Sequence, residues 1–283
     1  MKKILILMTA ALFPVIAGAQ AQINTKKIKI GDFQEKVTKI VLTGNDFYDL
    51  ALQDEIAAGW RLSPYEFCTM DEFNTFKNKE DYYFLITADG KFKNEDDPGI
   101  TFLTLVKGGK GAEEGISKML EVVSLPIASA ENPSGREFTF MPAFIDIIQD
   151  YTIAAMSKDF NGYMGLGSNT ESLKKEQNME LVFAECDLAE DVDRAFIDLN
   201  FDSDMSVTDE DSASDLMEAG AAGKVISYVV VPDEPVAGSY CYKMLISPES
   251  HKLYYFRKHR ISKKYGAGFL QEDIIRINKQ RGR

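Results

Sequence analysis

Oxygen-bearing side chains alternate along one stretch of the chain in a spacing that suits calcium. Calcium prefers hard oxygen ligands, and EF-hand and dockerin loops supply them from alternating positions between helices. Helical patterns lie on both sides here, and Met205 is the hydrophobic residue expected at position 8. Ser203 replaces the glycine of the sharp turn, so we expect low affinity. The predicted ligands are Asp198, Asn200, Asp202, Asp204, Ser206 and Asp209, the last in place of a bidentate glutamate.

The same stretch has a second interpretation as an ordinary acidic strand and loop. Acidic residues crowd the segment 185–218, in which Arg194 is the single basic residue, whereas basic residues dominate from Lys252 to the C-terminus. Two oppositely charged faces can attract each other within one fold, or can simply be solvated. The sequence leaves these interpretations open beside that of a cation site.

Residues for nucleophilic catalysis are sparse. The chain has no G-x-S-x-G motif, and its two histidines, His251 and His259, fall in a predicted hairpin turn and at a basic strand end. Surface histidine is the favoured interpretation of both. The chain also lacks the clustered ligand spacing of a zinc site. No catalytic residue is therefore predicted.

Two glycine-rich loops have the composition of phosphate-binding loops without their spacing. Residues 107–111 (KGGKG) lie between a predicted strand and a predicted helix, which is the right place, but lack the Walker pattern. Gly162, Gly165 and Gly167 follow a helix and stand in the wrong order for a dinucleotide site. Turn glycines are the favoured interpretation of both loops, and no cofactor-binding residue is predicted.

Aromatic residues gather in the predicted strands, where an exported protein could use them to stack on a glycan. Core packing accounts for about half of them through strand alternation. Carboxylates for glycoside hydrolysis are plentiful in so acidic a chain, but no pair is singled out. The aromatic residues in question are Tyr82, Tyr83, Phe84, Tyr240, Tyr242, Tyr254, Tyr255 and Phe256.

The composition is that of an acidic globular protein. Apolar residues make up 45% and charged residues 27% of the chain, so disorder throughout is not expected. A net charge of −12 argues against nucleic-acid binding and against docking on anionic lipid, because both need basic surface. Cys68, Cys186 and Cys241 each lie in or beside a β-type run, which favours buried thiols. One disulfide with one free thiol is the alternative, with the pair left open.

The N-terminus is predicted to be a cleaved signal peptide covering residues 1–21. Lys2 and Lys3 precede an apolar stretch over residues 4–16 that is too short to span a bilayer comfortably. Small residues at 17–19 and 19–21 suit signal peptidase, and no cysteine follows that could carry a lipid anchor. We expect a periplasmic or secreted protein with no transmembrane segment after cleavage.

The first unit, residues 22–125, is expected to have the order β-α-β-α-β-β. Strands separated by helices of this length imply parallel crossovers, and the last two strands form a hairpin. A helix at 112–122 is expected next, and a connecting region over 126–175 with a linker at 126–137 and a long helix at 138–158. The expected strands are 37–42, 60–67, 81–87 and 100–106, with helices at about 46–59 and 70–77.

The second unit, residues 176–283, is expected to repeat that order. Matching elements lie about 140 residues apart, as an ancient duplication would leave them. We therefore predict an α/β fold of the mixed α+β kind, with two similar β-α-β-α-β-β units whose mixed sheets are flanked by helices. Two unrelated α/β segments are the alternative. The expected strands are 179–184, 201–207 and a meander of 225–231, 240–246 and 252–257, with helices at 189–198, 209–218 and 267–278.

Part of the first unit resembles a known family. The run of strand KIVL, helix DFYDLALQDEI, strand WRLSPYEF, helix MDEFNTF and strand DYYFLI is similar to the small α/β domain at the amino end of TolB and in CsgG-like periplasmic proteins. The resemblance covers roughly a fifth of the chain and implies a role in envelope assemblies rather than catalysis. The whole chain also resembles uncharacterised exported proteins of Bacteroidales, which implies no function. Neither resemblance transfers a functional residue.

Together these features predict a non-catalytic exported binding or envelope-assembly module. Its partner would be an envelope protein or a glycan. A periplasmic hydrolase acting on a polymer such as glycan is one alternative, and a calcium-binding protein is another. A deep cleft with paired carboxylates of shifted pKa would favour the hydrolase. A shallow surface that is aromatic or polarised in charge would favour the binding module.

Overall fold

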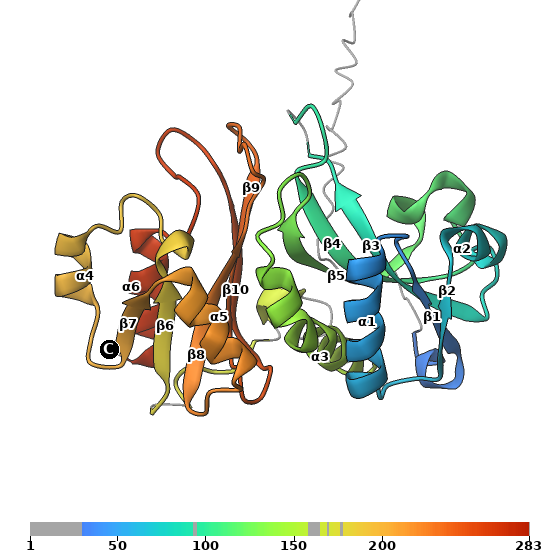
Figure 1. Cartoon of the computed structure of the whole chain (residues 1–283), viewed down its shortest axis with the longest axis horizontal. Helices are drawn as coiled ribbons and strands as arrows, with labels where there is room; N and C mark the ends of the chain where they lie inside the picture. The colour runs from blue at the N-terminus through green and yellow to red at the C-terminus, as the bar shows by residue number, and fades with distance from the viewer. Residues whose placement is uncertain (1–29, 93–94, 158–164, 169, 176–177, 283) are drawn as a thin grey trace, which may run out of the picture.

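In the computed structural model the chain folds into two α/β units, each built on a five-stranded mixed sheet. The structure describes residues 30–92, 95–157, 165–168, 170–175 and 178–282. The predicted signal peptide lies outside these described residues. Figure 1 shows the two sheets side by side, with the long helix α3 (Arg136–Met156) between them. Within the described ranges, no helix is long and apolar enough to cross a membrane.

The first unit combines three parallel strands with an antiparallel meander. Its elements are β1 (Val37–Val41), α1 (Asp46–Gly59), β2 (Tyr65–Cys68), α2 (Met70–Phe76), β3 (Tyr82–Gly90), β4 (Ile100–Lys107), β5 (Leu120–Ser129) and α3. β1 pairs in parallel with β2 and β3, whereas β3, β4 and β5 follow one another antiparallel. The order across the sheet is β2-β1-β3-β4-β5, so β2 and β5 are its edges.

The second unit repeats this plan. Its elements are β6 (Glu180–Ala184), α4 (Arg194–Asn200), β7 (Met205–Thr208), α5 (Glu210–Glu218), β8 (Lys224–Val230), β9 (Tyr240–Ile246), β10 (Leu253–Arg260) and α6 (Gln271–Arg281). β6 pairs in parallel with β7 and β8, and β8, β9 and β10 form the predicted antiparallel meander. The order across the sheet is β7-β6-β8-β9-β10.

The shared strand order confirms the predicted pair of similar units. Each unit runs β-α-β-α-β-β-β-α, and its first strand lies between its second and third. The registers also correspond, because Thr38 of β1 pairs with Tyr65 of β2 as Leu181 of β6 pairs with Met205 of β7. Positions in one unit can therefore be compared with positions in the other.

The expected helix at 112–122 is wrong, and the expected linker at 126–137 is limited to residues 130–135. Two short 3-10 turns, Ala112–Glu114 and Ile116–Lys118, replace most of the helix, and β5 crosses the expected unit boundary at residue 125. β5 tolerates Pro126 because it is an edge strand with a shift of register beside that residue. The first unit therefore has the same three-stranded meander as the second.

Local capping explains where several helices begin. Thr69 and Glu72 form the capping box expected from the sequence at the start of α2, and Asn45 accepts hydrogen bonds from the first turn of α1. Asp209 caps α5, one residue later than the Thr208 that the sequence suggested. α4 begins at Arg194 rather than at residue 189, because the preceding residues form a 3-10 turn and a loop with Asp193 as the cap.

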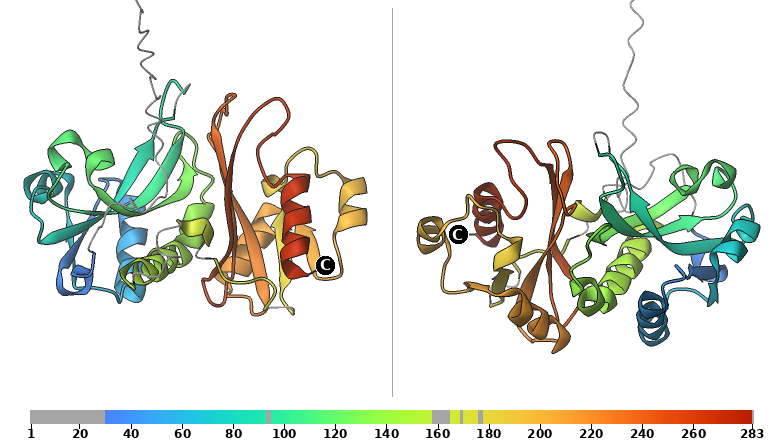
Figure 2. Two further views of the ribbon diagram at one scale, coloured as in Figure 1. Left: turned by 180° about the vertical axis from the view of Figure 1, so that it is seen from behind. Right: turned by 45° about the horizontal axis from the view of Figure 1, so that its top comes forward.

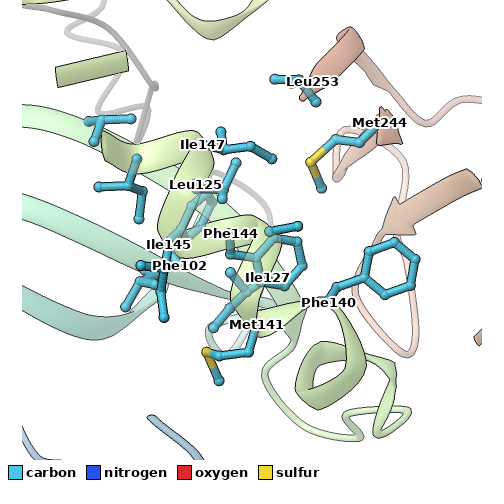
Figure 3. Close-up of a cluster of buried hydrophobic side chains, with 14 of the residues drawn as sticks. Phe102, Leu125, Ile127, Phe140, Met141, Phe144, Ile145, Ile147, Met244 and Leu253 are labelled. Carbon is cyan, nitrogen blue, oxygen red and sulfur yellow. The ribbon is translucent and has the colours of Figure 1, made fainter. Parts of the chain in front are cut away.

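α3 is the element that joins the two units. Twelve of its residues are buried, and the eight apolar ones belong to one cluster that includes both sheets. Figure 3 shows Phe140, Phe144 and Ile147 of α3 between Ile127 of the first sheet and Met244 of the second. A helix that is apolar on two sides needs a second surface to cover it. The second unit provides that surface, and its outer face is covered instead by α6 and α4 (Figure 2).

Candidate functional site

The second sheet has a crevice at the carboxyl ends of its parallel strands. The chain passes from β6 to β7 on one side and then returns to β8 on the other side of β6. Open α/β sheets bind ligands at such switch points. A hollow of about 270 Å³ lies here, lined by residues of both units, and we call it the Arg136 crevice. Its charged side chains are Arg136, Asp187, Glu210 and Asp233.

A buried ion pair occupies the inner wall of the Arg136 crevice. Arg136 Nη1 donates to Asp187 Oδ1 at 2.9 Å and Nη2 donates to Oδ2 at 3.1 Å. Asp187 also accepts hydrogen bonds from Ser227 Oγ at 2.6 Å and from Val229 N–H at 3.1 Å. Such a bidentate pair is fixed in geometry. It holds the first turn of α3 against the second sheet.

The Asp187 carboxylate controls protonation around this crevice. Burial lowers the pKa of Arg136, but the charge of Asp187 outweighs burial and raises that pKa above its usual value. Burial and the same carboxylate raise the pKa of Cys186 to about 12, although the residue as a whole is exposed. Cys186 Sγ accepts a hydrogen bond from Arg136 Nη1 at 3.5 Å. Because the thiolate is the reactive form, Cys186 is not an activated nucleophile at neutral pH.

The corresponding crevice of the first sheet is filled by its own side chains. Asp49 of α1 accepts hydrogen bonds from Thr43 N–H, Thr43 Oγ1 and Gly44 N–H, each at 2.8 Å. Tyr48 Oη lies 3.1 Å from Thr87 Oγ1, and burial raises the pKa of Tyr48 to about 12. These contacts tie the start of α1 to the ends of β1 and β3. The first switch point therefore serves the fold.

A larger hollow lies on the outer face of the second sheet. It has a volume of about 450 Å³ and lies between α4, β7 and the segment that joins β6 to α4; we call it the α4 hollow. α4 has no fully buried residue, and its contact with the outer-face cluster is made by the partly buried Phe196. Glu185, Glu190, Arg194 and Ser206 are the polar residues of its lining, and the apolar ones are Leu188, Ala189, Val192, Ile197, Phe201, Met205 and Val207.

Carboxylates flank the α4 hollow. Four exposed acids form what we call the acidic rim, namely Glu185, Glu190, Asp191 and Asp193. In the part of the chain that the structure describes, none of the four makes an ion pair, whereas the neighbouring Arg194 pairs with Asp198 at 2.9 Å. The hollow is therefore apolar inside and negative at its border.

The structure places three of the six predicted calcium ligands in other local roles. Asp198 pairs with Arg194. Asp209 Oδ1 accepts from Ser212 N–H and its Oδ2 from Ser212 Oγ, both at 2.8 Å. Ser206 lies in β7, a strand rather than a wrapped loop, and donates to Glu180 at 2.7 Å.

The other three ligands lie near α6. Asn200 Nδ2 donates a hydrogen bond to the backbone carbonyl of Phe196, four residues earlier in α4. Arg281 Nη1 lies 3.3 Å from both carboxylate oxygens of Asp202, and Nη2 lies 3.5 Å from Asp204 Oδ2. Asp202 and Asp204 of the acidic segment therefore form ion pairs with the basic segment at the C-terminus. No group of three or more His, Cys, Asp or Glu is placed to hold a metal among the described residues. The calcium site stays a prediction, which calorimetric titration of the wild-type chain and Asp202→Ala would test.

Both histidines make specific contacts rather than lying free on the surface. His251 sits in the β9–β10 hairpin turn with a φ of 55°, and its Nδ1 lies 2.7 Å from Asp146 Oδ2 of α3. His259 Nε2 lies 2.8 Å from the carbonyl of Gly266. Burial and the charge of Lys243 lower the pKa of His259. The pair of His251 and Asp146 links the two units, a contact that no local pattern in the sequence indicates.

The remaining sequence candidates belong to the fold. The three cysteines are unpaired, with Cys68 and Cys241 buried as expected and Cys186 exposed against expectation. Gly111 has a φ of 88°, and a Cβ there would meet the carbonyl oxygen of Lys118, so the 107–111 loop needs its glycine for a turn. The loop with Gly162 lies partly outside the described residues. Five of the eight strand aromatics are buried, namely Tyr83, Phe84, Tyr242, Tyr254 and Tyr255.

Comparison with known proteins gives no match, whether with family models, with curated proteins or with solved structures. The function is therefore inferred from the geometry and chemistry of the chain's own residues.

Proposed function

We propose that this chain is a non-catalytic, exported binding or envelope-assembly module, and that it binds its partner at the α4 hollow. The observation that carries the proposal is the coincidence of an apolar hollow of about 450 Å³ with an unpaired acidic rim. An apolar depression bordered by charge of one sign is typical of an interaction site. The resemblance to the TolB and CsgG-like α/β domain points to the same class of function.

The protonation of the carboxyl groups supports a binding role over hydrolysis. A glycosidase needs one carboxyl group with a raised pKa to act as general acid. Five carboxyl groups have a pKa that is shifted downward, namely Asp32, Asp146, Glu180, Asp209 and Asp273. In the Arg136 crevice, Asp187 is held in a buried bidentate ion pair with Arg136. These features favour the binding module over the hydrolase.

Photo-crosslinking in the cells that make the protein tests the proposal. A benzophenone amino acid replaces Glu190 on the acidic rim, or Asp54 on the exposed side of α1 as a control. We expect one discrete adduct with an envelope component from position 190, none from position 54, and loss of the adduct when Ile197→Asp is added. No adduct from position 190, or the same adducts from both positions, would overturn the proposal.

Export is the second part of the proposal. It is supported by Lys2, Lys3 and the short apolar stretch at 4–16. Intact-mass measurement of the chain produced in a Gram-negative host should show loss of the residues before Gln20 or Gln22. A purified mature protein that still begins at Met1 would contradict export by this route.

A further inference from the structure

The backbone of β7 is open on one side of the second sheet. β7 is an edge strand whose single neighbour in the sheet is β6. Leu181 N–H of β6 donates to the carbonyl of Asp204 at 2.9 Å. Successive residues of a strand turn their backbone groups to opposite sides, so Ser206 faces β6 and Val207 faces away. The N–H and C=O of Val207 are thus directed to where another strand could pair.

The α4 hollow lies on the sheet face beside this open edge. Met205, Ser206 and Val207 of β7 line the hollow, together with apolar residues from α4 and the segment before it. A segment that adds to β7 would send alternate side chains toward this face, where apolar side chains fit the hollow. The site therefore provides backbone pairing and side-chain burial at one place.

The acidic rim favours a partner segment that carries positive charge. Glu185 and Glu190 line the hollow, and Asp191 and Asp193 stand next to them in the chain. Residues between the apolar ones would point to the other face of the sheet, so lysine or arginine at the ends of the apolar run is what places positive charge against this acidic rim. A second copy of this chain does not fit, because pairing β7 with β7 would bring two acidic rims together.

We propose that the α4 hollow receives an extended segment of a partner protein in which alternate residues are apolar and basic residues flank the apolar run, and that this segment adds to β7 as a further strand. The inference rests on the proposed binding function and names the chemistry of the partner. The edge of the first sheet is unlike this one. At β2, Glu66 pairs with Lys39 at 2.8 Å, so the carboxylate beside that edge is neutralised.

The test uses a fluorescent peptide of alternating threonine and valine with two lysines at each end, which we call the lysine–valine peptide, and fluorescence anisotropy with the mature protein. We expect saturable binding that weakens as salt is raised, and no binding of the matched glutamate–valine peptide. Val207→Pro removes the outward N–H and should weaken binding about tenfold, since proline is tolerated at a strand edge. Phe67→Pro makes the same change at the corresponding position of β2 and should leave affinity unchanged.

A modified peptide provides a second test that does not depend on whether the Val207→Pro variant folds. A lysine–valine peptide methylated at alternate backbone nitrogens cannot pair as a strand, so it should bind the wild-type protein about tenfold more weakly. Equal affinity of the methylated and unmethylated peptides, or binding of the acidic peptide, would overturn the inference. If the adduct at position 190 forms in cells but the lysine–valine peptide does not bind, the partner class is wrong and the proposed function stands. If neither is seen, both fail.

Discussion

The helix after the first strand serves the two units differently. In the first unit, α1 has 14 residues and buries Leu52 and Ile56 against the sheet. In the second unit, α4 has 7 residues and buries none. The two sheets share their strand order, so this difference comes from the connection and not from the topology. One copy of the unit uses the connection to build core, whereas the other leaves a hollow at the same place.

The last helix of each unit differs in a similar way. α3 lies between both sheets, whereas α6 covers one sheet and exposes its other side to solvent. At matching positions of the sheets, Leu103 packs in the apolar cluster around α3 and Lys243 pairs with Asp273 of α6. The side chains of Leu103 and Lys243 are both fully buried. α3 is thus held by apolar packing, whereas α6 is held also by the buried ion pair of Lys243 and Asp273.

The largest expected effect comes from breaking the ion pair between Lys243 and Asp273. Asp273→Asn removes the carboxylate charge with little change in shape and leaves Lys243 buried without a counter-ion. We expect the free energy of unfolding to fall by about 3–5 kcal/mol. Chemical denaturation followed by circular dichroism measures this loss.

Lys243→Leu is the matched control, because it copies Leu103 of the first unit. Asp273 keeps its hydrogen bonds from Tyr255 Oη at 2.7 Å and from Arg257 Nη1 at 3.0 Å, so no charge is left unpaired. We expect a loss below about 2 kcal/mol. Equal losses for the two variants would show that the ion pair does not distinguish α6 from α3.

An intermediate effect is expected from truncating the helix after the first strand. Ile56→Ala in α1 removes a fully buried side chain, and we expect a loss of about 2–4 kcal/mol in the free energy of unfolding. Ile197→Ala in α4 should cost less than about 1 kcal/mol, since that side chain is half-buried beside the α4 hollow. If the two losses are similar, α4 packs on the sheet in solution and the hollow is closed.

The smallest effect concerns pH and the ion pairs at the strand ends. Burial raises the pKa of Asp32, but hydrogen bonds from Lys107, Tyr83 and Lys36 outweigh burial and lower that pKa from 3.8 to about 2. The folded state therefore gains stability from Asp32 above pH 3.8, and loses it as the pH falls toward about 2. At neutral pH, the free energy of unfolding of the wild-type protein should exceed that of Asp32→Asn by at most about 1 kcal/mol, because the ion pair of Asp32 is partly exposed.

Glu180→Gln is the counterpart in the second unit. Hydrogen bonds from Lys224 and Ser206 lower the pKa of Glu180, so its contribution has the same sign and is also lost in acid. Thermal melts of the wild type and both variants across this pH range measure the two contributions. A difference for Asp32→Asn that grows as the pH falls would contradict the assignment.

Local patterns predicted much of the fold. Runs of apolar, aromatic and β-branched residues marked nearly every strand, and Thr69 with Glu72 marked the start of α2 through a capping box that depends on four neighbouring residues. β5 was missed because glycines and glutamates at 109–115 imitate a helix start, and because Pro126 is unfavourable except at an edge. Whether a strand is at an edge depends on its partners, which lie far away in the chain.

The sequence by itself determined the two mixed α/β units, their repetition and the excess of acidic residues between 185 and 218. Those features follow from periodicity and composition, which act over short distances along the chain. Only the tertiary structure decided that Arg136 meets Asp187 and that Lys243 meets Asp273, since these pairs are separated by 51 and 30 residues. It also decided that α4, unlike α1, has no fully buried residue. Burial and pairing of that kind depend on how the two sheets pack around α3, and no local pattern contains that information.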